Sequence, residues 1–176
     1  DRKGEAEKEL REAIAAVGRH IDAARRNVAL AEKHRPGSAA PGRPIQRILD
    51  ELRTLQSNFH YSLGLLLAEQ PSRLAEATAA LSDAAKLDPS NARVHYNLGV
   101  AEMHRKRPAE AERSLLKAHE LARGTPDFVR TLAIFYSQEK RWDAAIEFAR
   151  LLIALEPGNE SQALLQQILR ESQASE

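Results

Sequence analysis

HYSLG at residues 60–64 and HYNLG at residues 95–99 decide the fold of this chain. The two stretches differ at one position and lie 35 residues apart. Working outward, a further step of 34 residues carries Leu98 and Gly99 onto Leu132 and Ala133. A repeat of this length, built from two helices and a turn, is the mark of an α-solenoid. The shared His-Tyr pair is therefore first of all the trace of a duplicated structural unit.

The repeat predicts three helix-turn-helix units at residues 57–91, 92–125 and 126–159. Each has room for two helices of about 13 residues, the usual length of a helix in a compact protein. Polar and proline-containing segments supply the turns within the units, at Gln70–Ser72, Arg105–Pro108 and Glu139–Arg141. With alanine and leucine supplying much of the apolar content, the chain is expected to be all-α.

The repeated positions resemble the tetratricopeptide repeat (TPR), in which small residues and a Leu-Gly pair recur at set places. The first unit supplies Leu63, Gly64, Ala77, Leu81, Ala84 and Pro89, and the second supplies Leu98, Gly99, Ala111, Leu115 and Ala118. Small residues let two helices approach closely, so Gly64, Gly99 and Ala133 are expected to face Ala77, Ala111 and Ala145. The resemblance covers about 100 residues and implies a TPR-like solenoid.

Two departures from the family pattern concern local geometry. The step from Gly64 to Ala77 is one residue longer than its counterparts, which places an insertion near Pro71. The third unit has Ala149 and Leu152 where a large residue and then an alanine are expected. Neither change removes the small residues that bring the helices together.

Residues 1–56 are expected to form an N-terminal helical hairpin. Its first helix, Glu5–Lys33, carries apolar residues at alternating steps of four and three, a heptad seam. The proline- and glycine-rich segment His34–Pro44 ends that helix, and Ile45–Leu55 forms the second. The seam is a candidate oligomerisation or docking surface, and it consists of Leu10, Ile14, Val17, Ile21 and Val28.

At the other end, residues 160–176 form a further amphipathic helix. Leu164, Leu165, Ile168 and Leu169 share one face, and glutamines and charged residues occupy the other. A solenoid needs such a polar-faced helix at its end for solubility. This segment is therefore expected to be the C-terminal capping helix.

In the family that the chain resembles, the first helix of each unit lines a concave groove that binds peptides. Carried over position by position, the resemblance implies a partner-binding set of Asn58, Tyr61, Leu65, Arg93, Tyr96, Val100, Met103, Arg130 and Ile134. Such a mainly apolar surface with polar anchors suits an amphipathic helix or an extended peptide. The alternative is that the N-terminal helix fills this groove within the same chain.

Chaperone-binding members of the family hold the terminal carboxylate of a peptide with lysine, arginine and asparagine residues. Among the equivalent positions only Asn97 matches; Tyr61, Leu65, Asp127 and Thr131 do not. The chain is therefore expected not to bind chaperone tails of this kind.

The sequence offers little for chemistry. There is no cysteine, and no Gly-x-Ser-x-Gly, His-Glu-x-x-His or dinucleotide-binding motif occurs. Adjacent units place His60 and His95 at equivalent positions, but a metal site needs a third ligand that the sequence does not show. One of His20, His34 or His104 could instead serve as an axial ligand to a partner's cofactor. No metal, cofactor or catalytic residue is assigned to the chain itself.

We therefore expect a non-catalytic scaffold or protein-interaction module whose protein partner the sequence does not identify. The alternative is that the chain is a structural subunit of a larger homo- or hetero-oligomeric assembly. Such an assembly could be exported and could carry a cofactor. The formal net charge of +1 gives no reason to expect nucleic acid, and no apolar run reaches the ~18 residues of a membrane span. The chain starts at Asp1 without an initiator methionine, so export is as much an expectation as a cytoplasmic location.

Overall fold

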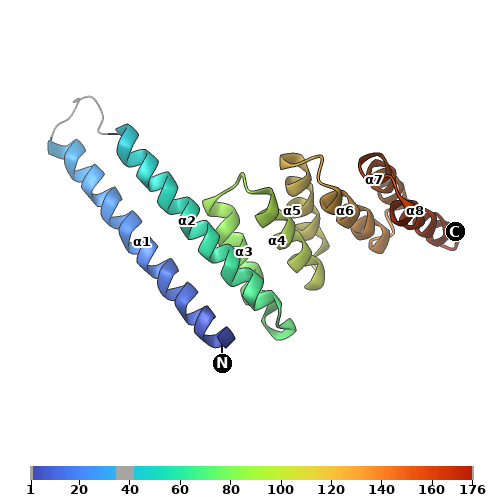
Figure 1. The fold of residues 1–176 in the computed structure, drawn as a ribbon, viewed down its shortest axis with the longest axis horizontal. Helices are drawn as coiled ribbons and strands as arrows, with labels where there is room; N and C mark the ends of the chain where they lie inside the picture. Colours follow the sequence, from blue (N-terminus) through green and yellow to red (C-terminus); the bar gives the residue numbers. More distant parts are fainter. Residues whose placement is uncertain (1, 35–41, 176) are drawn as a thin grey trace. The chain divides into compact units, whose positions relative to one another are not determined.

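The computed structural model describes residues 2–34 and 42–175, and these form helices joined by short turns (Figure 1). The chain divides into two compact units, Asp1–Pro89 and Ser90–Glu176. The first contains α1 (Arg2–His34), α2 (Gly42–Ala68), the 3₁₀ turn η1 (Pro71–Arg73) and α3 (Leu74–Leu87). The second contains α4 (Ala92–His104), α5 (Pro108–Leu121), α6 (Pro126–Gln138), α7 (Trp142–Leu155) and α8 (Asn159–Gln173). The described residues contain no strand, as the all-α prediction requires.

Helix α2 runs without a break through the boundary that the sequence places at residue 56. The expected second hairpin helix and the first helix of the first repeat are therefore one helix. The physical reason lies in its two neighbours: the amide of Gln56 lies against the backbone of α1, and the hydroxyl of buried Ser57 donates to the carbonyl of Ala84 on α3, 2.9 Å away. Since no proline interrupts residues 45–68, nothing ends the helix between these contacts.

The heptad seam of α1 packs against α2 of the same chain, and Figure 1 shows the two helices side by side. Leu10 and Ile14 contact a cluster around Leu63 and Leu67, while Val17 and Ile21 are buried with Leu49, Ala24 lying beside them. Val28 is half-buried. The seam therefore builds the hairpin, and its proposed role in oligomer formation stays a prediction. Within the expected linker, His34 is the last residue of α1 and Gly42 begins α2, while residues 35–41 lie outside the described residues.

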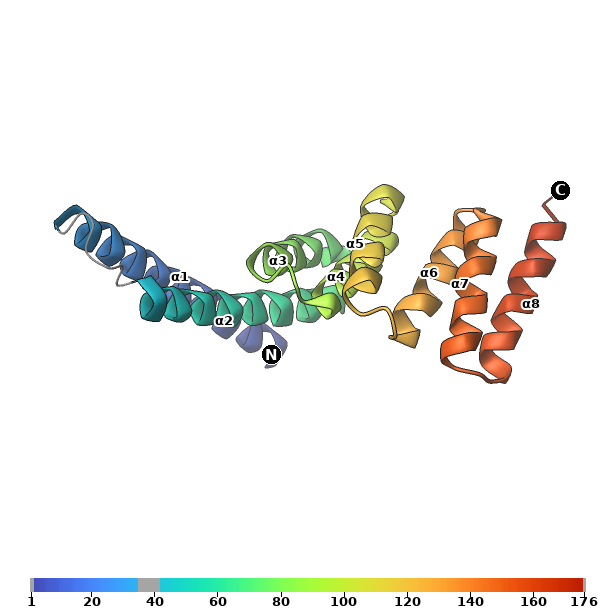
Figure 2. The same cartoon turned by 90° about the horizontal axis from the view of Figure 1, so that it is seen from above.

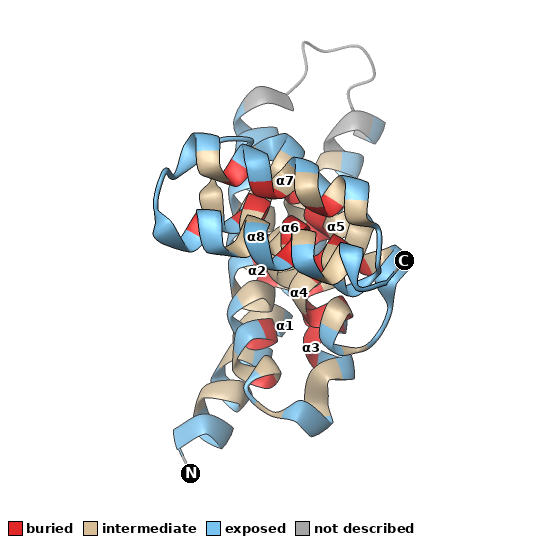
Figure 3. Cartoon of the chain, turned by 90° about the vertical axis from the view of Figure 1, so that its right-hand side faces the viewer, coloured by how far each residue is buried: buried red, intermediate tan, exposed pale blue. Residues whose placement is uncertain are grey.

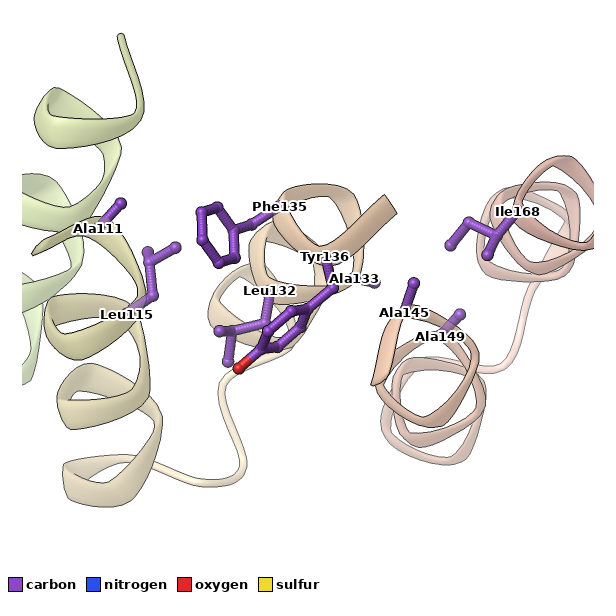
Figure 4. Packing of buried hydrophobic residues seen from close by; sticks show 9 residues of the cluster. All are labelled: Ala111, Leu115, Leu132, Ala133, Phe135, Tyr136, Ala145, Ala149 and Ile168. Carbon is purple, nitrogen blue, oxygen red and sulfur yellow. The ribbon is translucent and has the colours of Figure 1, made fainter. Parts of the chain in front are cut away.

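In the second unit, the helices pack around one apolar cluster (Figures 2 and 4). Leu132 and Phe135 of α6 point towards Ala111 and Leu115 of α5, and Ala133 points the other way, towards Ala145 of α7. Buried residues of α6 thus face both α5 and α7 (Figure 4), and buried segments of the second unit are red in Figure 3. A first helix between two second helices is the arrangement that a continuous solenoid core requires.

The close helix approach expected at the glycines is present, but the residue opposite each glycine is a leucine. A β-carbon on Gly64 would lie 2.7 Å from the Cγ of Leu81, and 3.3 Å from the carbonyl oxygen of Ala77. The alanines expected to face the glycines are buried beside this contact, with Ala77 and Ala111 fully inaccessible. Glycine is therefore required because the leucine side chain occupies the space that its own side chain would need.

The turns within the second and third repeats share one backbone geometry. Lys106 and Lys140, 34 residues apart, both adopt positive φ, 57° and 56°. Proline occupies the first position of α5 and α6, where its missing N–H costs no hydrogen bond. The first repeat departs from this pattern: the inserted residue near Pro71 produces η1. The expected insertion is therefore visible as a different turn.

Helix α8 begins at Asn159 and packs on α7. Ile168 is buried, and the hydroxyl of buried Ser161 donates to the carbonyl of Glu156, 2.7 Å away. Leu164 and Leu165 pack on the core cluster, whereas Gln162, Gln166 and Gln167 are exposed. This is the one-sided pattern expected of the capping helix.

Candidate functional site

Tyr96 joins the first helices of the second and third repeats. Its ring stacks on that of Phe128, with centroids 4.8 Å apart and an interplanar angle of 23°. Its hydroxyl lies 3.1 Å from the Oγ1 of Thr131. Tyr96 remains half-buried while Phe128 is 4 % exposed. The aromatic pair therefore sets α4 against α6 and keeps an edge of the tyrosine at the surface.

Four further residues of the predicted groove lie on α4 and α6, two of them charged and two apolar. Arg93, one turn before Tyr96, is exposed and forms no ion pair with any described residue. Arg130 forms an ion pair with Glu156, 2.6 Å from guanidinium nitrogen to carboxylate oxygen, and is 28 % exposed. Val100 lies one turn after Tyr96 on α4, and Ile134 lies one turn after Arg130 on α6. Both are half-buried. We call Arg93, Tyr96, Val100, Arg130 and Ile134 the α4–α6 face.

Met103 was also predicted to line the groove, and it packs half-buried against the core cluster together with Val100. In the first unit, Asn58 is exposed, Tyr61 is half-buried and Leu65 is 37 % exposed. Helix α1 therefore leaves Asn58 and Leu65 uncovered within this unit. The sequence did not predict that Phe128 and Thr131 would contact Tyr96, because nothing in the repeat spacing marks a ring partner on the next helix.

A polar cluster connects α5, α6 and the turn before α7. The hydroxyl of Tyr136 donates to Glu112 at 2.8 Å, and Arg141 contacts the same carboxylate oxygen at 2.7 Å. The Arg141 guanidinium also lies over the Tyr136 ring, 4.6 Å from its centroid. Burial and then the hydrogen bond to Glu112 raise the pKa of Tyr136 to about 12. Burial opposes the ionisation of Glu112, but the hydrogen bonds from Arg141 and Tyr136 outweigh it and lower its pKa.

The histidines singled out by the sequence have separate environments. The Nδ1 of His60 is buried without a hydrogen-bond partner among the described residues. Burial lowers the pKa of His60, against the opposing charge of Asp83. His95 is half-buried in the other unit. His20 and His104 are exposed, and His20 Nδ1 donates to the carbonyl of Ala16 at 2.7 Å. The side chain of His34 lies outside what the structure describes.

Residues 2–34 and 42–175 contain no group of three or more histidine, aspartate or glutamate side chains placed to hold a metal ion. No helix in these ranges is long and apolar enough to cross a membrane. The predicted axial-ligand role of a histidine stays a prediction.

Comparisons with known proteins agree with this architecture. A family model described as TPR repeat matches residues 72–103, which hold most of α3 and α4. None of the curated proteins compared matches the chain. Among solved structures, the first TPR of Spaghetti (RPAP3) bound to the HSP90 peptide SRMEEVD is 19% identical, covers 66% of this chain and 93% of its own, and has a TM-score of 0.62.

Two further neighbours cover more of the chain at similar identity. A structure of MamA is 20% identical over 73% of this chain and 80% of its own, with a TM-score of 0.57. PilF of Pseudomonas aeruginosa is 21% identical over 99% of this chain and 89% of its own, with a TM-score of 0.56. At these identities the likeness concerns the fold. Together with the matched repeat, the Leu-Gly contacts and the stacked helix pairs, it shows that the chain has a TPR-like helical-repeat fold, with residues 72–103 matching the TPR repeat itself.

Proposed function

We propose that this chain is a non-catalytic protein-recognition module, and that the α4–α6 face receives an amphipathic helix or an extended peptide of a partner protein. The observation that carries the proposal is the anchoring of Tyr96 between Phe128 and Thr131, at 4.8 and 3.1 Å. A side chain already held in place loses little conformational entropy when a partner binds. Half-buried aromatic residues next to an arginine are also the usual energetic centre of a protein interface.

The composition of the face suits a partner with both apolar and polar groups. Val100 and Ile134 offer apolar contact, while Arg93 is an exposed cation with no ion pair among the described residues. Arg130 is already engaged by Glu156 and so contributes an oriented guanidinium. A similar fold in the RPAP3 structure is bound to a peptide, which supports this reading by analogy of fold alone.

A site-specific cross-linking experiment tests the proposal. A photoreactive amino acid is placed at position 134 in the full chain, and a matched control carries it at position 150, where exposed Arg150 of α7 forms no ion pair with a described residue. In extract from the native source, the Ile134 probe is expected to capture a discrete protein that Tyr96→Ala releases. Equal capture from both positions, or capture insensitive to Tyr96→Ala, contradicts the proposal. If position 134 cross-links only a second copy of the chain, the structural-subunit alternative replaces it.

A further inference from the structure

The first half of α1 is held to the first repeat by charged groups. Six side chains form this network, which we call the latch: Lys3, Glu7, Arg11, Glu69, Arg73 and Glu76. At its centre, two guanidinium nitrogens of Arg73 contact the two carboxylate oxygens of Glu7, at 2.6 and 2.8 Å. These two side chains are 24 % and 19 % exposed, less than the rest of the latch. The latch therefore joins α1 to the η1–α3 turn.

The latch exists because the first repeat departs from the other two. The inserted residue near Pro71 forms η1, and Arg73 is the last residue of that turn. In the other repeats the corresponding turn contains Lys106 or Lys140 at positive φ, which form no ion pair among the described residues. Hydrogen bonds from Arg73 and Arg11 lower the pKa of Glu7 to about 2, so the carboxylate stays charged across the physiological range. The altered turn thus has a specific partner in α1.

Beneath the latch, the apolar contact is incomplete. Leu10 and Ile14, both half-buried, cover a floor of Leu63, Leu67 and Ala80. A pocket of about 210 Å³ remains beside this contact, lined by Arg11, His60, Leu63, Leu67, Glu76, Ala79, Ala80 and Asp83. Because Leu10 and Ile14 are only half-buried and the pocket opens to solvent, this part of α1 covers the floor incompletely. Further along, Val17 and Ile21 are 8 % and 5 % exposed and hold the rest of α1 firmly.

Gly18 lies where the loosely packed half of α1 meets the firmly packed half. A β-carbon there would find only the amide nitrogen of Gln56, at 3.4 Å, so packing does not require glycine. The same amide lies 3.5 Å from the carbonyl oxygen of Ile14, the acceptor that a regular helix gives to the N–H of Gly18. A glycine combined with a side chain that competes for a helical carbonyl is a recognised cause of helix bending.

We propose that residues 2–16 of α1 are a hinged lid, which bends at Gly18 and is kept closed over the Leu63–Leu67–Ala80 floor by the Arg73–Glu7 ion pair. Screening of the latch by salt opens the lid and uncovers the floor, while Val17 and Ile21 keep the remainder of α1 in place. This proposal is independent of the α4–α6 face.

Hydrogen exchange of the full chain, measured by mass spectrometry, tests the lid. Arg73→Gln, or about 1 M sodium chloride, where the Debye length is about 3 Å, is expected to speed exchange in residues 2–16 about fivefold or more. Gly18→Ala is expected to slow exchange in the same residues. Arg47→Gln is the matched control, because Arg47 forms an exposed i,i+4 ion pair with Glu51 on α2, outside the latch. Exchange in residues 20–34 is expected to stay unchanged in all variants.

Two results overturn the lid: unchanged exchange of residues 2–16 in Arg73→Gln, or an equal increase throughout residues 2–34, which would mean loss of the whole hairpin. A second measurement, the distance between two spin labels, tests the opening of the lid directly. Because the sequence has no cysteine, spin labels attached through Lys8→Cys and Ala75→Cys are unique. Arg73→Gln is expected to add a longer-distance population between them, and an unchanged single distance contradicts the proposal.

Discussion

Gly99 of α4 lies directly against Leu115 of α5, so that a β-carbon on Gly99 would be 2.7 Å from the Leu115 Cγ. The third repeat has Ala133 in place of the glycine and Ala149 in place of the leucine, and both alanines are fully inaccessible. The departure of Ala149 from the family pattern is thus explained: a larger residue on the first helix accompanies a smaller one on the second.

Gly99→Ala is expected to destabilise the protein by up to about 2 kcal/mol, because overpacking costs about 1–3 kcal/mol and the gain in helix propensity offsets about 1 kcal/mol of it. Leu115→Ala alone leaves a cavity and is expected to cost about 2–5 kcal/mol. The double variant, Gly99→Ala with Leu115→Ala, reproduces the alanine pair found in the third repeat. Its loss of stability should therefore be about 1 kcal/mol smaller than the sum of the losses in the two single variants. Urea unfolding of the four proteins measures this coupling, and strict additivity contradicts the steric explanation.

Lys140→Gly is expected to stabilise the protein by about 1 kcal/mol, because Lys140 adopts a φ of 56° that side chains with a β-carbon disfavour. The matched control is Arg150→Gly, at an exposed position inside α7. There, the introduced glycine is expected to destabilise the protein by about 1 kcal/mol because of its low helix propensity. Opposite signs for the two glycine substitutions in thermal unfolding support the turn geometry. Destabilisation by both substitutions is the contrary result.

The Tyr136 hydroxyl makes stability depend on alkaline pH. The folded pKa, about 12, lies above the ordinary value, so the tyrosine's contribution is complete below about pH 10 and is lost as pH rises towards 12. Tyr136→Phe is expected to cost about 1 kcal/mol at pH 8, since it removes one of the two hydrogen bonds that the Glu112 oxygen accepts and leaves only the one from Arg141. It should also flatten the decline in urea midpoint between pH 9 and 11. An unaltered slope would show that the pKa of Tyr136 is the same in the folded and unfolded states, which contradicts the prediction.

His119 makes stability depend on acidic pH in the opposite direction. Its ring meets that of Phe148 edge to face, with centroids 5.6 Å apart, and burial, then the charge of Arg123, lower its pKa. The neutral form is favoured in the folded protein, so stability is complete above about pH 6.5 and falls as pH drops through the lower folded pKa. His119→Leu keeps an apolar side chain against Phe148 and should reduce the loss of urea midpoint between pH 7.5 and 5.5. An equal loss in both proteins refutes this assignment.

Chaperone-type peptides are expected not to bind. Asn97 matches the residues that hold a terminal carboxylate in chaperone-binding TPR proteins, but its neighbours among those positions do not. Titration of the full chain with the peptide SRMEEVD, which is bound in the RPAP3 structure, should give no saturable signal in calorimetry. Saturable binding that Asn97→Ala abolishes would reverse this prediction.

The sequence by itself determined the architecture, because the features that define a TPR are local and periodic. The Leu-Gly pair, the small residues of the second helix and the polar turns recur every 34 or 35 residues, and each acts within one helix pair. The turns at Arg105–Pro108 and Glu139–Arg141 lie where the structure has them, between α4 and α5 and between α6 and α7. Helical period and turn chemistry are enough to place such elements.

Only the tertiary structure decided which side chains meet across helices. Sequence spacing ended a helix at Leu55, whereas α2 continues because α1 packs on one side of it and α3 on another. It likewise gave no sign that the ring of Tyr96 would stack on Phe128 or that Arg73 would meet Glu7. Periodicity specifies which face of a helix is apolar, but the partner of a side chain depends on how helices distant in sequence cross, and that depends on the packing of the whole unit.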